Sequence, residues 1–292
     1  MAAPAPQSLQ PSAEEQIARI ESSCQIMRTS CGDGEMVWRV WGRGPTLVLL
    51  HGSFGSWMHW IRNIEALSRH FRVVAADMPG FGDSALPADP RSCVCIVETI
   101  ASGIDRLTAS DEPIKIAGFS YGASLSSPVA LASKRRTDTI CLVGSHGLGG
   151  KRGDPGPLVK WHDAKTPEEL RLAQYQNLAA LLIADPANID ELSIHVQTIN
   201  TRKTRLRSRE VTDRPKLNGS VERVKSRIVS IWGSLDATAY PFVAECEKRL
   251  LEARPDAEMR LLEGIGHWVC YEAADAFTPL MITMLGAETA TA

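Results

Sequence analysis

Ser120 lies in a short motif whose residue types suit nucleophilic chemistry. The apolar segment 114–117 runs into Gly118-Phe-Ser-Tyr-Gly122, and a helical pattern follows over 123–133. Where a strand turns sharply into a helix, the hydroxyl of the central serine stands exposed above the sheet, and the flanking glycines let strand and helix pack closely. We therefore predict that Ser120 is a nucleophile.

An alcohol is a weak nucleophile near neutral pH, so it needs a base, and the base needs an acid that orients it. Asp236 follows the apolar segment 227–232, and His267 follows the apolar segment 258–262. The order serine, aspartate, histidine is the one expected for a hydrolase that carries this motif. The sequence therefore predicts a catalytic triad of Ser120, His267 and Asp236.

The oxyanion of an acyl-transfer intermediate needs preorganised N–H donors close to the nucleophile. One predicted donor is the backbone N–H of Tyr121, at the start of the helix after the nucleophile. The second should come from the loop after the apolar segment 46–50, where we predict Ser53, with Phe54 as the alternative. In the same loop, His51 is expected to be a buried, hydrogen-bonded brace and not a base.

Short apolar segments recur along the chain and are the predicted strands of one sheet. Two half-buried strands come first, at 23–29 and 36–41, and six wholly apolar segments follow, at 46–50, 72–76, 114–117, 139–143, 227–232 and 258–262. Continuous apolar runs are typical of strands that helices cover on both faces. The sequence therefore predicts the α/β class, with a mostly parallel sheet flanked by helices.

The alternation of strands and helices breaks after residue 143. Glycines and prolines are followed by two helical patterns, at 167–184 and 187–209, without a strand between them. We predict three parts, namely a tail and short helix over 1–22, a core over 23–146 and 219–292, and a helical lid over 147–218. The lid should lie above the carboxyl edge of the sheet, where open α/β sheets bind ligands.

Composition and charge narrow the range of partners. The chain has 292 residues, of which 44% are hydrophobic and 23% charged, and its net charge is −2. A balanced charge gives no field to attract nucleic acid or an anionic membrane, and no apolar run approaches the ~20 residues of a membrane-spanning helix. Seven cysteines without CxxC spacing, and no visible secretory signal, predict reduced thiols and a cytoplasmic location. We expect a small molecule as the substrate, and the sequence leaves open whether the protein forms a homodimer.

Several motifs carry a resemblance to the α/β-hydrolase superfamily that covers roughly residues 23–285. They are His51-Gly52, Asp77 to Ser84, Gly118 to Gly122, Trp232 to Asp236 and Gly266-His267. The resemblance implies an eight-stranded, mostly parallel sheet with a helical lid inserted after the sixth strand, and no metal or organic cofactor. The segment 77–84 is interpreted as turn architecture without a chemical role.

Ester hydrolysis makes the fewest further demands on such a site. We therefore expect a serine carboxylesterase that cleaves a small or medium, partly apolar ester through an acyl-enzyme. The segment Gly266 to Glu272 also resembles the histidine loop of meta-cleavage product hydrolases, which split carbon–carbon bonds. Those enzymes usually carry asparagine before the nucleophile and methionine after it, whereas this chain has Phe119 and Tyr121. A carbon–carbon bond hydrolase and a triad-bearing small-molecule receptor are the alternatives.

Candidate substrate contacts lie close in sequence to the predicted site. They are Phe54, Trp57, His146 and Trp268. Residues 201–209 also hold five basic side chains, and such a run usually forms a solvated face. In the functional interpretation, Arg202 or Arg205 leans into the cleft and pairs with a substrate carboxylate.

Overall fold

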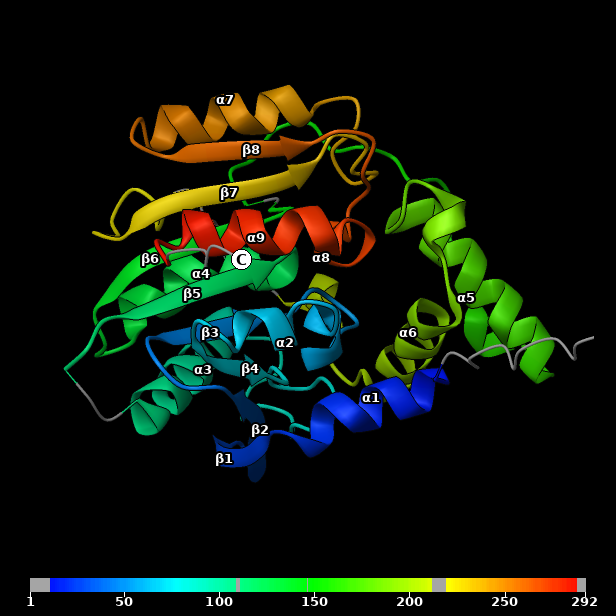
Figure 1. Cartoon of the computed structure of the whole chain (residues 1–292), viewed down its shortest axis with the longest axis horizontal. Coiled ribbons are helices and arrows are strands. Elements are labelled where there is room, and N and C mark those ends of the chain that lie inside the picture. Colours follow the sequence, from blue (N-terminus) through cyan, green and yellow to red (C-terminus); the bar gives the residue numbers. More distant parts are fainter. Residues whose placement is uncertain (1–10, 109–110, 146, 212–218, 288–292) are drawn as a thin grey trace, which may run out of the picture.

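The computed structural model describes residues 11–108, 111–145, 147–211 and 219–287. Within them, eight strands form one sheet in the order β1-β2-β4-β3-β5-β6-β7-β8 (Figure 1). The strands are β1 (Gln25–Cys31), β2 (Gly34–Trp41), β3 (Thr46–Leu50), β4 (Arg72–Ala76), β5 (Ile114–Phe119), β6 (Thr137–Val143), β7 (Arg227–Gly233) and β8 (Glu258–Leu262). Strand β2 is antiparallel to β1 and β4, and the neighbours from β4 to β8 are parallel. The predicted α/β class, with a mostly parallel sheet, is confirmed.

Helices cover both faces of the sheet. They are α2 (Ile64–Leu67), α3 (Cys93–Leu107), α4 (Tyr121–Ala132), α7 (Val243–Ala253), α8 (Val269–Glu272) and α9 (Ala274–Met284). In β3, Leu49 packs in the apolar cluster that includes residues of α2 and α9, whereas Val48 packs in the cluster of α3 and α4. Because both faces are buried, the central strands are apolar throughout, and they stand out in the sequence as continuous hydrophobic runs.

A helical insertion, residues 144–226, connects β6 to β7. It contains η2 (Trp161–Asp163), α5 (Pro167–Leu181), η3 (Pro186–Asn188), α6 (Glu191–Lys203) and η4 (Ser208–Glu210). The Thr166 hydroxyl caps the start of α5, and the Asp190 carboxylate caps the start of α6. Figure 1 shows α5 and α6 beyond the carboxyl ends of β7 and β8, on the side to which the strand arrows point.

The second helix of the insertion is shorter than the pattern at 187–209 predicts, because α6 ends at Lys203. After it, the backbone N–H groups of Arg205 and Leu206 both donate to the carbonyl oxygen of Gly80, at 2.9 and 3.1 Å. The Leu206 side chain is buried, and its Cβ lies 2.5 Å from where a Cβ on Gly80 would be. Contacts with another part of the chain therefore replace the last turns of the predicted helix.

The N-terminal helix α1 (Ala13–Ser22) begins at Ser12 with a capping box. The backbone N–H of Ser12 donates to the Glu15 carboxylate at 2.8 Å, and the N–H of Glu15 donates to the Ser12 hydroxyl at 3.1 Å. Glu14 lies 3.2 Å from Nδ1 of His195 on α6, so this helix contacts the insertion.

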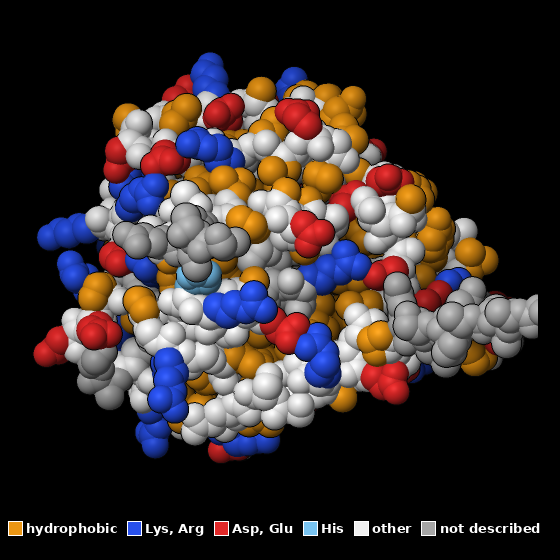
Figure 2. Space-filling model, viewed as in Figure 1, with side chains coloured by type: hydrophobic (Ala, Val, Ile, Leu, Met, Phe, Trp, Pro, Cys, Tyr) orange, Lys and Arg blue, Asp and Glu red, His pale blue; other side chains and the backbone are white. Residues whose placement is uncertain are grey.

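Charged side chains of both signs share the surface. On the face shown in Figure 2, Lys and Arg side chains are interspersed with Asp and Glu. Among the residues described, no helix combines the length and the apolar character needed to cross a membrane.

Candidate active site

Ser120 lies between β5 and α4 in a strained turn. Its φ of 52° is a positive value that a non-glycine residue rarely adopts, at a cost of roughly 1–3 kcal/mol. The turn requires glycine on both sides. A Cβ on Gly118 would lie 2.4 Å from the backbone of Gly122, and a Cβ on Gly122 would lie 2.4 Å from the carbonyl oxygen of Leu50. The strand–turn–helix geometry predicted for this motif is therefore present.

The structure brings the three residues of the predicted triad into one hydrogen-bonded chain. Nε2 of His267 lies 2.9 Å from Oγ of Ser120, and Nδ1 lies 2.7 Å from Oδ2 of Asp236. His267 and Asp236 follow β8 and β7, so parallel strands deliver both to the edge of the sheet where Ser120 follows β5. His267 is 4% exposed and Asp236 is fully buried. An imidazole held in this way can take the serine proton at Nε2 while the carboxylate stabilises the imidazolium at Nδ1.

Thr238 is a contact of the site that the sequence analysis missed. Its backbone N–H and its hydroxyl both donate to Oδ1 of Asp236, at 2.9 and 2.6 Å. The two oxygens of the carboxylate therefore have separate partners, and the one that faces His267 has a fixed direction. In turns, an aspartate side chain often accepts a hydrogen bond from the backbone N–H two residues later in the chain. Thr238 stands two residues after Asp236, and this spacing is the sequence signal that could have predicted the contact.

The loop after β3 passes close to the nucleophile. A Cβ on Gly52 would lie 3.2 Å from the Cβ of Ser120, closer than most such contacts, so glycine lets the two segments approach. The next residue, Ser53, has its hydroxyl 2.8 Å from the hydroxyl of Ser208 in the insertion. Tyr121 is the first residue of α4, where backbone N–H groups lack intrahelical acceptors. Of the two predicted oxyanion donors, Tyr121 therefore follows Ser120 in the chain, and Ser53 follows Gly52, which lies close to Ser120.

His51 is fully buried and uses both ring nitrogens, as expected of a brace. Nε2 accepts the backbone N–H of Met78 at 2.9 Å, so Nδ1 carries the proton and donates to the carbonyl oxygen of Gly52 at 2.7 Å. Burial lowers the pKa of His51 to about 4, and the ring is therefore neutral at neutral pH.

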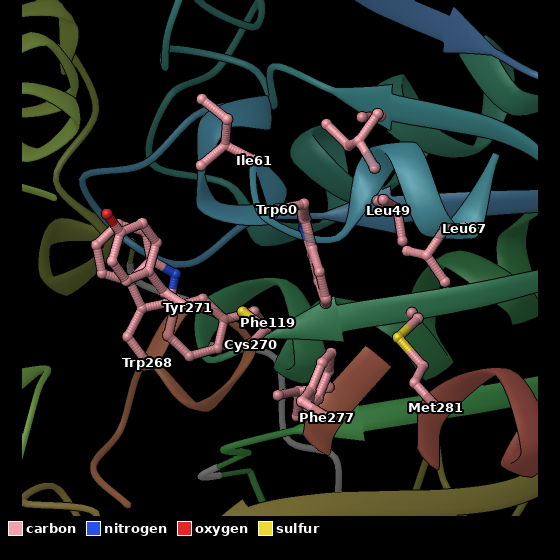
Figure 3. Packing of buried hydrophobic residues seen from close by; sticks show 14 of the residues in the cluster. Leu49, Trp60, Ile61, Leu67, Phe119, Trp268, Cys270, Tyr271, Phe277 and Met281 are labelled. Carbon is pink, nitrogen blue, oxygen red and sulfur yellow. The ribbon is translucent and has the colours of Figure 1, made fainter. Parts of the chain in front are cut away.

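Two of the side chains expected to contact substrate are packed in the core instead. Trp57 is 3% exposed, and its ring centroid lies 5.5 Å from that of Trp41 and 5.2 Å from Cζ of Arg39. Trp268 is fully buried, and its ring stacks on Tyr271 with the centroids 4.2 Å apart (Figure 3). Apolar packing accounts for both, and we do not retain them as substrate contacts.

The other two residues expected to contact substrate, Phe54 and His146, are not shown to be packed in the core. Phe54 is 38% exposed and has a positive φ of 53°, so the loop after β3 presents an aromatic ring to solvent in a strained turn. It stays a candidate for the pocket wall. His146 lies outside the described residues.

The basic segment of the insertion contacts the loop 77–84. The Arg205 guanidinium donates to the carbonyl oxygens of Gly82 and Ser84, and Nζ of Lys203 lies 2.6 Å from the Asp83 carboxylate. Arg202 is exposed on α6. The expectation that Arg202 or Arg205 pairs with a substrate carboxylate therefore has no support in these contacts.

The insertion also contacts the loop that carries His267. The carboxylate of Glu272 accepts the backbone N–H of Gly266 at 2.7 Å, that of Ala184 at 3.1 Å and that of Asp185 at 2.9 Å. Since Ala184 and Asp185 lie between α5 and α6, one buried carboxylate joins the corner of the insertion to the residue before the histidine.

Curated relatives of this chain are hydrolases. The chain is 27% identical over 267 residues to a 2-hydroxy-6-oxo-6-phenylhexa-2,4-dienoate hydrolase from Burkholderia cepacia, which covers 84% of this chain and 88% of the relative. It is 26% identical over 305 residues to a 2-hydroxy-6-oxononadienedioate/2-hydroxy-6-oxononatrienedioate hydrolase from Escherichia coli strain K12, over 95% of this chain and 99% of the relative.

Solved structures share the fold. An esterase from Rhodococcus sp. ECU1013 superposes with a TM-score of 0.76 at 20% identity, over 91% of this chain and 100% of that one. The meta-cleavage product hydrolase CumD from Pseudomonas fluorescens IP01 superposes with a TM-score of 0.70 at 22% identity, over 89% and 97%. The sequence profile of the alpha/beta hydrolase family matches residues 47–280, which include the nucleophile turn, both loops after β7 and β8, and the insertion. This chain therefore belongs to the α/β-hydrolase family.

Proposed function

We propose that this protein is a serine hydrolase that cleaves a small or medium carboxylic ester through an acyl-enzyme. The observation that carries the proposal is the hydrogen-bonded chain from Ser120 through His267 to Asp236, with 2.9 and 2.7 Å between the paired atoms. Three side chains that are distant in sequence meet in the order needed to activate an alcohol.

In the proposed mechanism, Oγ of Ser120 attacks the ester carbonyl while Nε2 of His267 takes the hydroxyl proton. The tetrahedral oxyanion accepts hydrogen bonds from the N–H groups of Ser53 and Tyr121. Its collapse breaks the bond to the leaving alkoxide, which receives the proton from His267. A water molecule, activated by the same imidazole, then attacks the acyl-enzyme and releases the carboxylic acid. Asp236 keeps the imidazole in the productive tautomer throughout.

The surroundings of the nucleophile favour an uncharged ester. Phe119 and Tyr121 flank Ser120 in the chain, and burial keeps the nearby His51 neutral. The Arg205 guanidinium bonds to backbone carbonyls of the loop 77–84, so it is not turned to a substrate carboxylate. We infer that the helical part of 147–218 acts as a lid and selects the acyl or alcohol group.

Hydrolysis of a carbon–carbon bond is the second candidate, because the curated relatives are hydrolases of 2-hydroxy-6-oxo dienoates. The same nucleophile and base would serve, with a carbanion equivalent as the leaving group. Since those compounds carry carboxylates, this candidate requires a cation in the pocket.

A substrate panel separates the two candidates. p-Nitrophenyl acetate, butyrate and octanoate would be compared with 2-hydroxy-6-oxo-6-phenylhexa-2,4-dienoate, and the variant S120A would serve as the control. We expect turnover of the short and medium esters that S120A abolishes. Turnover of the dienoate alone would reverse the ranking, and turnover that survives in S120A would exclude the serine mechanism.

A further inference from the structure

Gly52 precedes Ser53 in the loop after β3, here called the oxyanion loop, and a side chain on Gly52 would be crowded by its neighbours. The glycine leaves this loop without backbone rigidity of its own. A Cβ there would lie 3.0 Å from the Phe119 ring and 3.2 Å from the Cβ of Ser120. Glycine also has more backbone freedom than any other residue. The N–H of Ser53 can hold an oxyanion only while the peptide plane between Gly52 and Ser53 keeps one direction. Other groups must therefore fix the backbone of Gly52.

Two imidazoles hold the two peptide planes that meet at Gly52. Nδ1–H of His51 donates to the carbonyl oxygen of Gly52 at 2.7 Å, in the plane that also carries the N–H of Ser53. Carbonyl and amide point in opposite directions across a trans peptide, so this bond directs that N–H away from His51. The N–H of Gly52, in the preceding plane, donates to Nδ1 of His59 at 3.1 Å. His59 lies in η1 (Trp57–Trp60) and is not among the site residues predicted from the sequence.

His59 also contacts the neighbours of the nucleophile and of the base. Its ring meets the Phe119 ring edge-on, with centroids 5.4 Å apart, and lies 5.1 Å from the Trp268 ring. The carbonyl oxygen of His59 accepts the indole N–H of Trp268 at 2.9 Å. Phe119 precedes Ser120 and Trp268 follows His267, so one residue contacts the loop after β3, the nucleophile turn and the loop that carries His267.

At position 59, a histidine contributes less to stability than an apolar side chain of similar shape would. Because Nδ1 accepts from Gly52, the ring proton is on Nε2, and that buried nitrogen has no hydrogen-bond partner among the residues that the structure describes. An unpaired buried donor lowers stability, and an apolar side chain of similar shape would avoid the loss. Burial, followed by the fields of His51 and His267, lowers the pKa of His59 well below its usual range, so the ring is a neutral acceptor.

We propose that His59 is a positioning residue of the oxyanion hole. Its Nδ1 holds the N–H of Gly52 and thereby aims the N–H of Ser53 at the carbonyl oxygen that Ser120 attacks. This inference rests on the proposed function, since an oxyanion forms there only if Ser120 is the nucleophile.

The variants H59N and H59L are a matched pair, because asparagine and leucine branch alike and only Oδ1 of asparagine can accept where Nδ1 does. With p-nitrophenyl butyrate, we expect H59L to lose about tenfold to a hundredfold in kcat with KM unchanged, less than the ~10²–10³ typical of a deleted oxyanion donor. H59N should have a kcat at least about fivefold higher than that of H59L.

The control F277L removes an aromatic ring from the apolar cluster that includes Phe119 and Trp268 (Figure 3) and should lower stability without this loss of kcat. Equal losses in H59N and H59L, or a loss in F277L as large as in H59L, would overturn the assignment.

A second readout does not depend on turnover. In ¹H–¹⁵N spectra, the Gly52 amide proton should move upfield and exchange faster in H59L than in the wild type, and H59N should restore it. An unchanged Gly52 amide in H59L would also overturn the assignment. If the wild type hydrolyses no ester and a fluorophosphonate does not modify Ser120, the proposed function fails, while the Gly52 amide still shows whether His59 holds this loop.

Discussion

Asp236 uses its two carboxylate oxygens for separate tasks. Oδ2 faces Nδ1 of His267, and Oδ1 accepts two hydrogen bonds from Thr238. Hydrogen bonds to an ionised group are stronger than those between neutral groups, so the Thr238 hydroxyl fixes the direction of the acid.

The variant T238V removes the hydroxyl and keeps the shape of the side chain. We expect kcat to fall about tenfold, which corresponds to roughly 1.4 kcal/mol, because Oδ1 of Asp236 loses the hydroxyl donor and keeps the backbone N–H of Thr238. KM should be unchanged, since Thr238 bonds to the acid. Steady-state kinetics check this, with T238S as the control that restores the hydroxyl. A T238V enzyme with wild-type kcat would show that the backbone N–H is sufficient.

At this scale, the sequence predicts which residues meet but not where every side chain points. Ser120, Asp236 and His267 could be predicted because each follows a strand, and parallel strands end at one edge of a sheet. Trp57 and Trp268 were expected in the pocket but are packed in the core, since adjacency in sequence to a loop does not tell whether an aromatic ring turns to substrate or to the core. His59 was missed for the same reason, since its contacts with Gly52 and Trp268 depend on tertiary packing.

At the scale of elements, the insertion is joined to the site from two sides. The hydroxyls of Ser208 and Ser53 pair at 2.8 Å, and the backbone N–H of Trp268 donates to the carbonyl oxygen of Leu182 at 2.7 Å. The Glu272 carboxylate adds three backbone bonds between the corner of α5 and α6 and the histidine loop. A change in the insertion can therefore move both the loop after β3 and the loop that carries His267.

The variant E272Q tests this connection. Glutamine puts an N–H₂ group where a carboxylate oxygen accepted, so at least one backbone N–H loses its partner. We expect the free energy of unfolding to fall by about 2 kcal/mol, and urea unfolding measures it. The matched control is E191Q, whose carboxylate pairs with the exposed Arg171 and should contribute less than about 1 kcal/mol. Equal effects of the two substitutions would contradict the special role of Glu272.

The elements themselves could largely be predicted from the sequence. Central strands such as β3 stand out because burial on both faces demands uninterrupted apolar residues. The end of α6 could not be predicted, because residues 204–209 have no local signal to stop a helix. What ends it is the pairing of Arg205 and Leu206 with Gly80, more than a hundred residues away in the chain.

At the scale of the whole molecule, buried neutral histidines make stability depend on pH. His51 has a pKa of about 4 in the folded chain against 6.5 for the free side chain, so below pH 6.5 the unfolded state binds more protons. Stability is therefore lost as the pH falls from 6.5 towards 4, and His51 alone accounts for about 2 kcal/mol between pH 7 and 5.

Urea unfolding at pH 7 and pH 5 checks this prediction. The variant H51N keeps a donor for the Gly52 carbonyl oxygen and removes the titrating ring, so its stability should fall less between the two pH values. The expected difference between wild type and variant is about 2 kcal/mol. Identical losses in both proteins would show that His51 does not contribute to the pH dependence.

The proposed hydrolase activity requires that Ser120 is a nucleophile and that His267 activates it, and covalent labelling tests this most directly. The protein would be treated with a fluorophosphonate, and the adduct would be located by mass spectrometry of its peptides. We predict one adduct, on Ser120, formed at least about a hundredfold more slowly in H267A, because the hydroxyl then has no base. An adduct on another residue, or an unchanged rate in H267A, would contradict the account.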